Sequence, residues 1–367
     1  MRKMKWLMLK LIILAAFSLP EAFALRSPST YFQLKNDLLR TSQKEILTFV
    51  NEIVSVSKPS RMVGKAGHTK AHAWLVEEIK KLDPKESGKI IRQDIAPDIS
   101  EAKRFYESDL AKKKSTPEFS KWQKFSESMI EKSKSLSEEK VQNIIWEKAG
   151  LDSKKLLVIT AHYDTISHDP SSLLIREDAL MPGANFNASG VAVALGLIKT
   201  LAKFNLNYSV QIVFLDWQGV GFLGSFHHAK LLKESKKEVL GVLNLEMLGQ
   251  DTTYLDKTKK LGNMKLYLNH NEEEEKWASK LLVHGQKMTS RVDFTLTPNN
   301  FDDSDNFRYS DVGFKTVTFS QDWENDFNPK FYQTSQDTPE TLNHLTLYHN
   351  YLFIGGVSGG ILLDLTK

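Results

Sequence analysis

The spacing of hydrophobic residues alternates between a helical period and the continuous runs that are typical of buried strands. Residues 42–57 place Ile46, Val50 and Ile53 on one helical face, whereas residues 156–159 are all apolar. The pattern predicts strands at 89–95, 141–147, 156–162, 210–217, 239–247, 264–268 and 315–320. It predicts helices at 42–57, 68–82, 191–204, 226–234, 272–288 and from 340 onward.

Alternating strands and helices indicate a three-layer α/β/α domain around a mostly parallel sheet. We find no internal repeat and no clear linker, so residues 25–367 are interpreted as a single domain. Ligands of such sheets bind beyond the carboxyl ends of the strands. The loops that follow His162, Trp217, Met247 and Ser320 are therefore the candidate functional loops.

Residues 101–140 differ in composition from the rest of the domain. They contain ten Lys/Arg and eight Asp/Glu, with isolated aromatic residues at Phe105, Tyr106, Phe119, Trp122 and Phe125. This composition favours one or two surface helices with a narrow apolar stripe, forming a charged insertion. Two interpretations remain open, namely a solvated surface insertion or a lid over a cleft.

The N-terminus has the features of a targeting segment. A positive start, an apolar stretch at 11–19 and the sequence Ala-Phe-Ala at 22–24 predict a signal peptide over residues 1–24. The alternative is a membrane anchor, but a span needs about 20 apolar residues and Lys10 interrupts a longer stretch. We therefore expect an exported protein, periplasmic or secreted, that has no membrane span after cleavage.

Composition narrows the possible chemistry. The chain of 367 residues is 41% hydrophobic and 26% charged, which is ordinary for a globular protein. It has no cysteine, so disulfides, thiolate zinc sites and cysteine nucleophiles are excluded. Four Lys/Arg of the expected signal peptide account for most of the net charge of +4. We therefore expect no nucleic-acid partner.

Five loops carry a recognisable set of short motifs. They are AHYDT at 161–165, MPGANFNASG at 181–190, FLDWQGVGFLGS at 214–225, NLEMLG at 244–249 and FYQTSQDT at 331–338. In this order and spacing the motifs resemble the secreted di-zinc aminopeptidase family, which includes bacterial leucyl aminopeptidases and is related to glutaminyl cyclases. Arg61, Gly64, Gly67 and His68 also fit the early helix-and-turn region of that family.

The resemblance implies a specific site chemistry. Two zinc ions about 3.5–4 Å apart polarise the scissile carbonyl and share a hydroxide nucleophile. The family holds them with a His in the first loop, a bridging Asp, a Glu, an Asp and a late His. A neighbouring Glu acts as the general base toward water.

This sequence departs from the family pattern at most of these positions. His162 matches the first ligand, and Asp164 matches the carboxylate that supports it. The other positions are substituted: Phe186 for the bridging Asp, Gln218 for the general base, Gly219 for the Glu ligand, Glu246 for the Asp ligand, Gln333 for the late His, and Asn306 where the family usually has another His.

These substitutions predict a weak metal site. His162 and Glu246 are two strong ligands, whereas zinc catalysis needs three protein ligands and an open position. Phe186 would place an apolar ring at the bridging position, and the Gln218 amide is not a base at neutral pH.

Other donors could compensate for the missing ligands. The sequence Asp302-Asp303-Ser304-Asp305 forms an acidic cluster that we expect in a solvated loop near the site. We expect structural or surface roles for the remaining groups: His227, His228, His344, His349 and the run from Glu272 to Glu275, which begins a helix.

Three functions remain open. The first is a non-catalytic pseudo-peptidase without a cofactor, whose cleft binds a peptide amino terminus or a protein partner. The second is an active metallo-aminopeptidase that holds zinc through rearranged ligands. The third is a transferase such as a glutaminyl cyclase, which would need the same lost ligands.

Overall fold

The computed structural model describes residues 28–139, 141–169, 172, 174–252, 262–269, 272–297 and 304–365. The expected signal peptide lies outside the described residues, as do Asp302 and Asp303. Within the described ranges, no helix combines the length and apolar character needed to cross a membrane.

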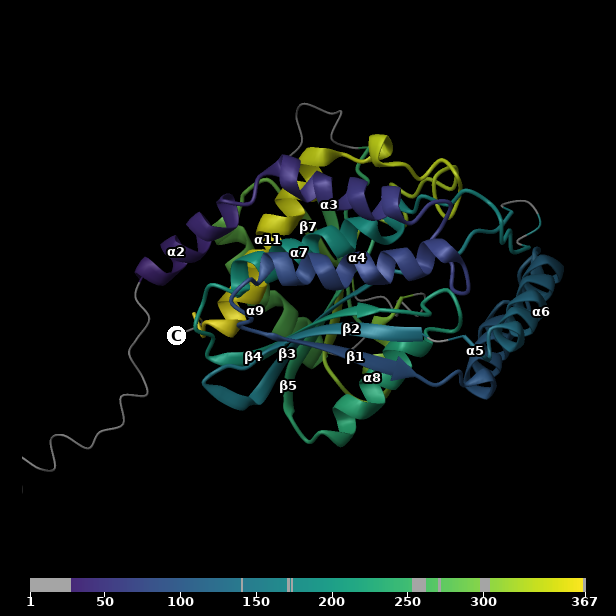
Figure 1. Cartoon of the computed structure of the whole chain (residues 1–367), viewed down its shortest axis with the longest axis horizontal. Helices are drawn as coiled ribbons and strands as arrows, with labels where there is room; N and C mark the ends of the chain where they lie inside the picture. The colour runs from purple at the N-terminus through teal and green to yellow at the C-terminus, as the bar shows by residue number, and fades with distance from the viewer. Residues whose placement is uncertain are drawn as a thin grey trace, which may run out of the picture.

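A mixed eight-stranded sheet forms the centre of the molecule, in the order β1-β2-β4-β3-β5-β8-β6-β7 (Figure 1). Strands β4, β3, β5 and β8 are mutually parallel, while β1, β2 and β6 join through antiparallel pairs. The strands are β1 Lys89–Ile95, β2 Val141–Lys148, β3 Asp152–His162, β4 Tyr208–Leu215, β5 Glu238–Leu245, β6 Asn263–Tyr267, β7 Asp293–Thr297 and β8 Thr316–Ser320.

Helices cover both faces of the sheet, which confirms the predicted α/β class (Figure 1). One face carries α2 Pro28–Leu39, α3 Gln43–Val56, α4 Ala66–Leu82, α7 Ser189–Leu201, α9 Glu272–Met288 and α11 His344–Leu362. The opposite face carries α8 Leu223–Glu234 and α10 Asn306–Asp311. Alternate residues of β3 serve the two layers, because Leu157 packs toward α7 and Val158 toward α8.

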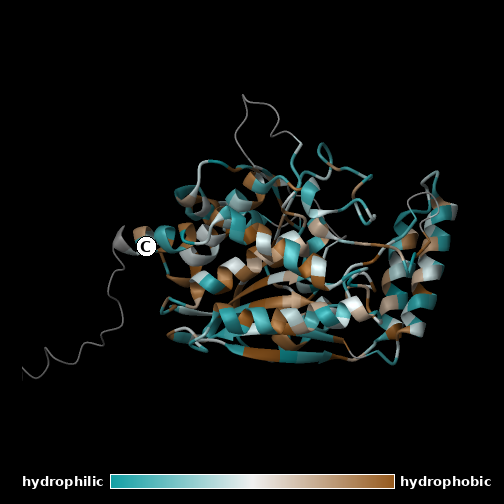
Figure 2. Cartoon of the chain, turned by 45° about the horizontal axis from the view of Figure 1, so that its top comes forward, coloured by the Kyte–Doolittle hydropathy of each residue, from teal (hydrophilic) through white to brown (hydrophobic). Residues whose placement is uncertain are grey.

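The charged insertion leaves the sheet between its first two strands and forms two helices, α5 Ile99–Lys112 and α6 Phe119–Ser135. The helices stand together at one end of the molecule (Figures 1 and 2). Tyr106 anchors α5 to the loop after β4, since its hydroxyl donates to the Gly219 carbonyl at 3.1 Å and accepts from the Gly221 amide at 3.0 Å. One side of the insertion therefore packs against a candidate functional loop.

The sequence pattern missed several short or marginal elements. Strand 89–95 and helix 272–288 have the predicted bounds, but β7, α10 and α2 were not predicted. Strand β7 is a partly exposed edge strand of five residues, and α10 has six residues, so neither provides a clear hydrophobic period. Helix α2 contacts the core mainly through Leu34 and Leu38, with Phe32 exposed to solvent.

Candidate functional site

The parallel strands bring the candidate loops together at one edge of the sheet. Strand β3 ends at His162, β4 at Leu215, β5 at Leu245 and β8 at Ser320. These four strands are adjacent and run in the same direction, so the residues that follow them share the same edge.

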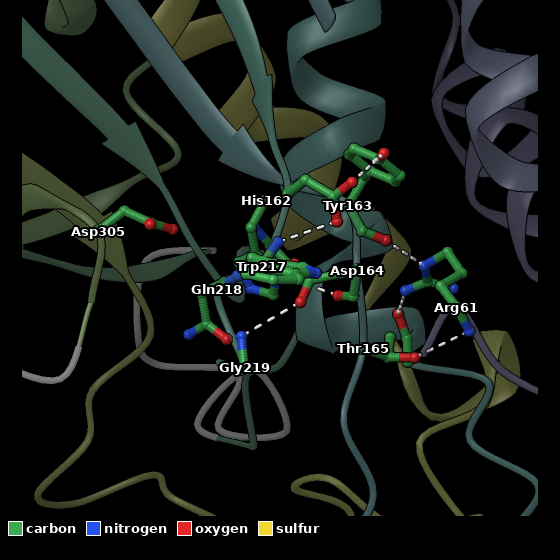
Figure 3. A network of polar contacts seen from close by, with 12 residues as sticks. Arg61, His162, Tyr163, Asp164, Thr165, Trp217, Gln218, Gly219 and Asp305 are labelled. Carbon is green, nitrogen blue, oxygen red and sulfur yellow. Dashed lines mark hydrogen bonds and ion pairs between the residues drawn. The ribbon is translucent and has the colours of Figure 1, made fainter. Parts of the chain in front are cut away.

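His162 lies at this edge among buried carboxylates (Figure 3). Its Nδ1 donates to the Asp164 backbone carbonyl at 3.1 Å, and its Nε2 lies 3.8 Å from Oε1 of Glu246. Burial disfavours the imidazolium, but the hydrogen bond to Asp164 and the charges of Glu246 and Asp305 outweigh it. The pKa of His162 is therefore raised above its ordinary value.

The prediction of a solvated loop is wrong for Asp305, which is completely buried. Ser225 donates to Oδ1 of Asp305 at 2.5 Å, whereas Oδ2 has no hydrogen-bond partner. Burial raises the pKa of Asp305 to about 7, although the charge of His162 opposes that shift. Ser304, the preceding residue, donates to Oε2 of Glu246. Ser304 and Asp305 therefore both belong to the buried polar cluster around His162.

Asp164 holds the loop after β4. Its Oδ1 accepts from the backbone amide of Gln218 at 3.2 Å, and its Oδ2 accepts from that of Gly219 at 3.1 Å (Figure 3). Both carboxylate oxygens therefore position a loop backbone, in addition to the ion-pair distance of 3.5 Å from Asp164 to His162.

Phe186 packs against both His162 of the buried cluster and Tyr332. Its ring is fully buried, with its centroid 4.7 Å from that of His162 and 5.3 Å from that of Tyr332. Met181 and Met247 pack around it in one apolar group. The side chain at the position where the family is expected to bridge two metals is therefore the centre of a small hydrophobic cluster.

Arg61 and Asp337 fix the loop that carries Phe186. The buried Arg61 guanidinium donates to the carbonyls of Tyr163, Pro182 and Gly183 at 2.7–2.8 Å, and burial lowers its pKa to about 10. Its backbone amide also donates to the hydroxyl of Thr165 (Figure 3).

The Asp337 carboxylate completes this support from the C-terminal part of the chain. It accepts from the backbone amides of Asn185 at 2.8 Å and Phe186 at 3.0 Å. Burial raises the pKa of Asp337 to about 6, against the effects of these hydrogen bonds and of Arg61. The motifs around Arg61 and Asp337 were noted in the sequence, but their supporting role was not predicted.

A cleft of about 340 Å³ lies between the insertion and the C-terminal loops, and Tyr332, which packs against Phe186, is part of its lining. Gln218, Gly219 and Gln333 form part of its surface, and the Nε2 of Gln333 donates to the Tyr332 hydroxyl at 3.1 Å. The cleft is lined by Phe105, Tyr106, Asp109, Lys113, Trp122, Phe125, Ile166, His168, Gln218, Gly219, Phe222, Trp323, Tyr332 and Gln333. Because residues of the insertion line this cleft, the arrangement favours the second interpretation of the insertion, a lid over a cleft.

The donor set does not fit a pair of zinc ions. In the part of the chain that the structure describes, no group of three or more His, Asp or Glu side chains is arranged to hold a metal ion. Gly219 has no side chain that could bind a metal, and a Cβ there would lie 3.0 Å from the Ile166 Cβ, so Ile166 would have to shift by a few tenths of an ångström to admit a side chain. His162 and Glu246 are adjacent, but Phe186 occupies the neighbouring volume.

The other sequence candidates lie apart from this cluster or serve packing. His228 is buried against Tyr309, its Nδ1 lying 2.8 Å from the hydroxyl, and Thr289 bonds His349 at 3.1 Å. Asn306 is buried at the start of α10, near Asn269. The remaining candidates are His227 in α8, His344 at the start of α11 and Glu272–Glu275 in the first turn of α9.

Curated relatives match about a third of the chain. A probable zinc metalloprotease of Pyrenophora tritici-repentis is 30% identical over 113 residues, which make up 30% of this chain and 23% of that protein. The aminopeptidase YwaD of Bacillus subtilis is 30% identical over 111 residues, 29% of this chain and 22% of that protein. The match thus spans less than a quarter of the length of these relatives.

Solved structures match over most of the chain and establish the fold. The LapA aminopeptidase of Legionella pneumophila has a TM-score of 0.67 at 14% identity, covering 93% of this chain and 76% of that chain. A glutaminyl cyclase of Porphyromonas gingivalis has a TM-score of 0.61 at 15% identity, covering 88% and 99%. The family model described as Peptidase family M28 matches residues 143–355, more than half of the chain. The chain therefore belongs to peptidase family M28.

Proposed function

We propose that this protein is a non-catalytic member of peptidase family M28 that uses its cleft to bind a peptide or protein partner. The observation that carries the proposal is the position of Phe186, whose ring lies 4.7 Å from that of His162 and is fully buried. A metal ion at this position would lose hydration without gaining a ligand from the phenyl ring.

The proposal is also supported by the chemistry of the cleft surface. Peptide hydrolysis needs a base that takes a proton from water, and Gln218 offers only a neutral amide. Glu246 and Asp305 are buried, and each accepts a hydrogen bond from a serine, Ser304 and Ser225 respectively. These hydrogen bonds use one oxygen of each carboxylate for the packing of the loops.

Export remains part of the proposal. The motif order at residues 1–24 is that of a secretory signal peptide, and a peptide-binding protein outside the cytoplasm would meet peptides directly. Expression of the full chain in a bacterial host, followed by fractionation and N-terminal sequencing, tests this part. A mature N-terminus at Leu25 supports it, and an uncleaved cytoplasmic chain contradicts it.

An active metallo-aminopeptidase is the second candidate. Its support is the similarity to peptidases, since the matched relatives are a probable zinc metalloprotease and the aminopeptidase YwaD. It would require zinc to bind through His162, Glu246 and further donors, for example Asp305 or Gln333.

Two measurements on the full mature chain separate the candidates. The protein is purified with zinc in every buffer, gel-filtered, and its metal content determined by elemental analysis. Hydrolysis of a broad panel of aminoacyl chromogenic substrates is then measured with zinc and with chelator. We expect less than about 0.1 zinc per chain and no chelator-sensitive hydrolysis. One zinc per chain, or hydrolysis that chelator removes and zinc restores, would overturn the proposal.

A further inference from the structure

We infer that the cleft is a binding site for an uncharged aromatic group that is flanked by amides, such as an internal or acylated aromatic residue of a peptide. The inference rests on the proposed function, because it assigns the ligand of a cleft that does no metal chemistry. Three features of the cleft lead to it, namely its aromatic walls, its lack of unpaired charge and its amide-bearing surface.

Aromatic rings from distant parts of the chain form two opposing walls. The insertion contributes Trp122 and Phe125, whose ring centroids are 5.9 Å apart in an edge-to-face arrangement. The C-terminal loops contribute Trp323 and Tyr332, also edge to face at 5.5 Å. Such ring clusters favour another aromatic ring, which gains both apolar burial and quadrupole contacts.

The charged groups at the cleft neutralise one another. The Nζ of Lys113 lies 2.6 and 2.7 Å from the two carboxylate oxygens of Asp109, and 4.5 Å from the centroid of Trp122. His168 is the third titratable group that faces the cleft, and burial lowers its pKa, which keeps the imidazole neutral. A ligand that carries an ammonium group would therefore lose hydration without meeting an unpaired carboxylate.

The side-chain amides define the polar part of the ligand. Gln218 and Gln333 both line the cleft, and an amide both donates and accepts hydrogen bonds. A peptide group has the same complementary pair. The volume of about 340 Å³ is near the lower end of ligand pockets, which are roughly 300–1,000 Å³. It suits one aromatic residue with its two flanking amides.

The experiment compares three small probes that differ in one feature each. N-acetyl-phenylalaninamide has the ring and both amides, phenylalaninamide has a free ammonium group, and N-acetyl-alaninamide lacks the ring. Binding to the full mature chain is followed by the fluorescence of Trp122 and Trp323 and by calorimetry. We expect saturable binding of the first probe, about tenfold weaker binding of the second and no measurable binding of the third.

Variants locate the site of binding. Trp122→Ala is expected to weaken binding of N-acetyl-phenylalaninamide about tenfold, and Trp122→Phe should restore most of that loss. Phe119→Ala is the matched control, because Phe119 belongs to the same helix and is not among the residues that line the cleft. Circular dichroism and thermal midpoints show whether each variant is folded, and calorimetry replaces fluorescence for the Trp122 variants.

The outcomes separate this inference from the proposed function. If the protein is free of zinc and inert, but the alanine and phenylalanine probes behave alike or phenylalaninamide binds more tightly, only the present inference fails. If stoichiometric zinc and hydrolysis are found, the proposed function fails. In that case the probe order and the Trp122 variants still decide whether the cleft selects an uncharged aromatic group.

Discussion

The buried cluster around His162 and the neighbouring cleft have opposite characters. In the cluster, His162 lies among the buried carboxylates Asp164, Glu246 and Asp305. In the cleft, the surface consists of aromatic side chains, neutral amides and the ion pair of Asp109 with Lys113. The carboxylates of the buried cluster thus accept hydrogen bonds from the protein itself, whereas the cleft surface that a ligand would contact carries no unpaired charge.

This contrast shows how a binding scaffold can keep its shape when its chemistry changes. Asp164 and Asp337 accept backbone amides of two different loops, at distances of 2.8–3.2 Å. Those bonds fix the backbone independently of a metal ion. The side chains of Gln218 and Gln333 line the cleft and take no part in these bonds, so they can differ from the family pattern without unfolding the loops.

Restoring the family residues should have the largest effect, because it would place carboxylate and imidazole groups that can bind zinc where the chain now has Phe186, Gln218, Gly219 and Gln333. We expect Phe186→Asp, Gln218→Glu, Gly219→Glu, Glu246→Asp and Gln333→His together to raise the zinc content from near zero to about one or more per chain. Elemental analysis and thermal midpoints with and without zinc measure the change.

A fourfold variant that keeps Gly219 is the matched control for the restored protein. A Cβ at that position would lie 3.0 Å from the Ile166 Cβ, so Ile166 must shift slightly before a glutamate can be accepted. We expect the fourfold variant to hold at most one zinc. If neither variant binds zinc, the backbone of these loops no longer places the restored side chains at the positions that the family uses.

Removing the aromatic ring of Phe186, which packs against His162 of the buried cluster, should destabilise the fold strongly. Phe186→Ala leaves a cavity beside Met181 and Met247, and we expect a loss of about 3–5 kcal/mol in the free energy of unfolding. Phe186→Leu keeps most of the volume and should cost about 1–2 kcal/mol. Urea denaturation at pH 7.5 compares the two. Equal losses of stability in the two variants would mean that the Phe186 ring is not tightly packed in this apolar group.

A variant of Arg61 tests whether the buried charged groups stabilise the loops rather than bind a ligand. Arg61→Lys keeps the charge but cannot reach the three carbonyls that the guanidinium satisfies, so we expect a loss of about 2 kcal/mol in stability. The affinity for N-acetyl-phenylalaninamide, measured well below the thermal midpoint, should change less than about twofold. A large change in affinity with little change in stability would contradict this division of roles.

The smallest expected effect is the pH dependence that His168 confers on the stability of the protein and on its affinity for the probe. Burial lowers the pKa of His168 below the ordinary value of 6.5, so the folded protein binds this proton less readily than the unfolded chain. Its contribution to stability is complete above pH 6.5 and is lost as the pH falls from there through the lowered pKa. Over the same window, probe affinity should fall about threefold as the cleft gains charge.

His168→Gln removes the contribution of His168, so the probe affinity of this variant should fall less between pH 7.5 and 5.5 than that of the unchanged protein. The stability of the variant still varies with pH, because the pKa values of Asp305 and Asp337 are about 7 and about 6. Asp109 and Lys113 also face the cleft, where the Nζ of Lys113 lies 2.6 and 2.7 Å from the two carboxylate oxygens of Asp109. A variant that keeps the full pH dependence would assign the effect to another group.

Much of the fold could be predicted from the sequence because its elements have strong local patterns. Strand β1 and helix α9 were predicted with their observed bounds, and the apolar run of β3 indicated a strand covered on both faces. Strand β7 and helix α10 were missed because five or six residues at an edge or in a loop carry little periodic information.

The site could be predicted in part, since the motifs identified the loops but not their contacts. Asp305 follows two other acidic residues and therefore has the local signature of solvent exposure. Its burial depends on Ser225, which is 80 positions earlier in the chain. The role of the insertion depends on Tyr106 meeting Gly219 and Gly221 across more than 110 positions. No local pattern encodes such contacts.

The insertion begins and ends on residues that face each other, since Ile95 at the end of β1 pairs with Val141 at the start of β2. A segment with adjoining ends can be shortened to a tight turn, lengthened or exchanged while the register of the two strands stays the same. Because the segment supplies one wall of the cleft, descendants of one ancestral domain could acquire different ligand preferences by replacing this hairpin alone. Their hydrophobic core and their other loops would not need to change.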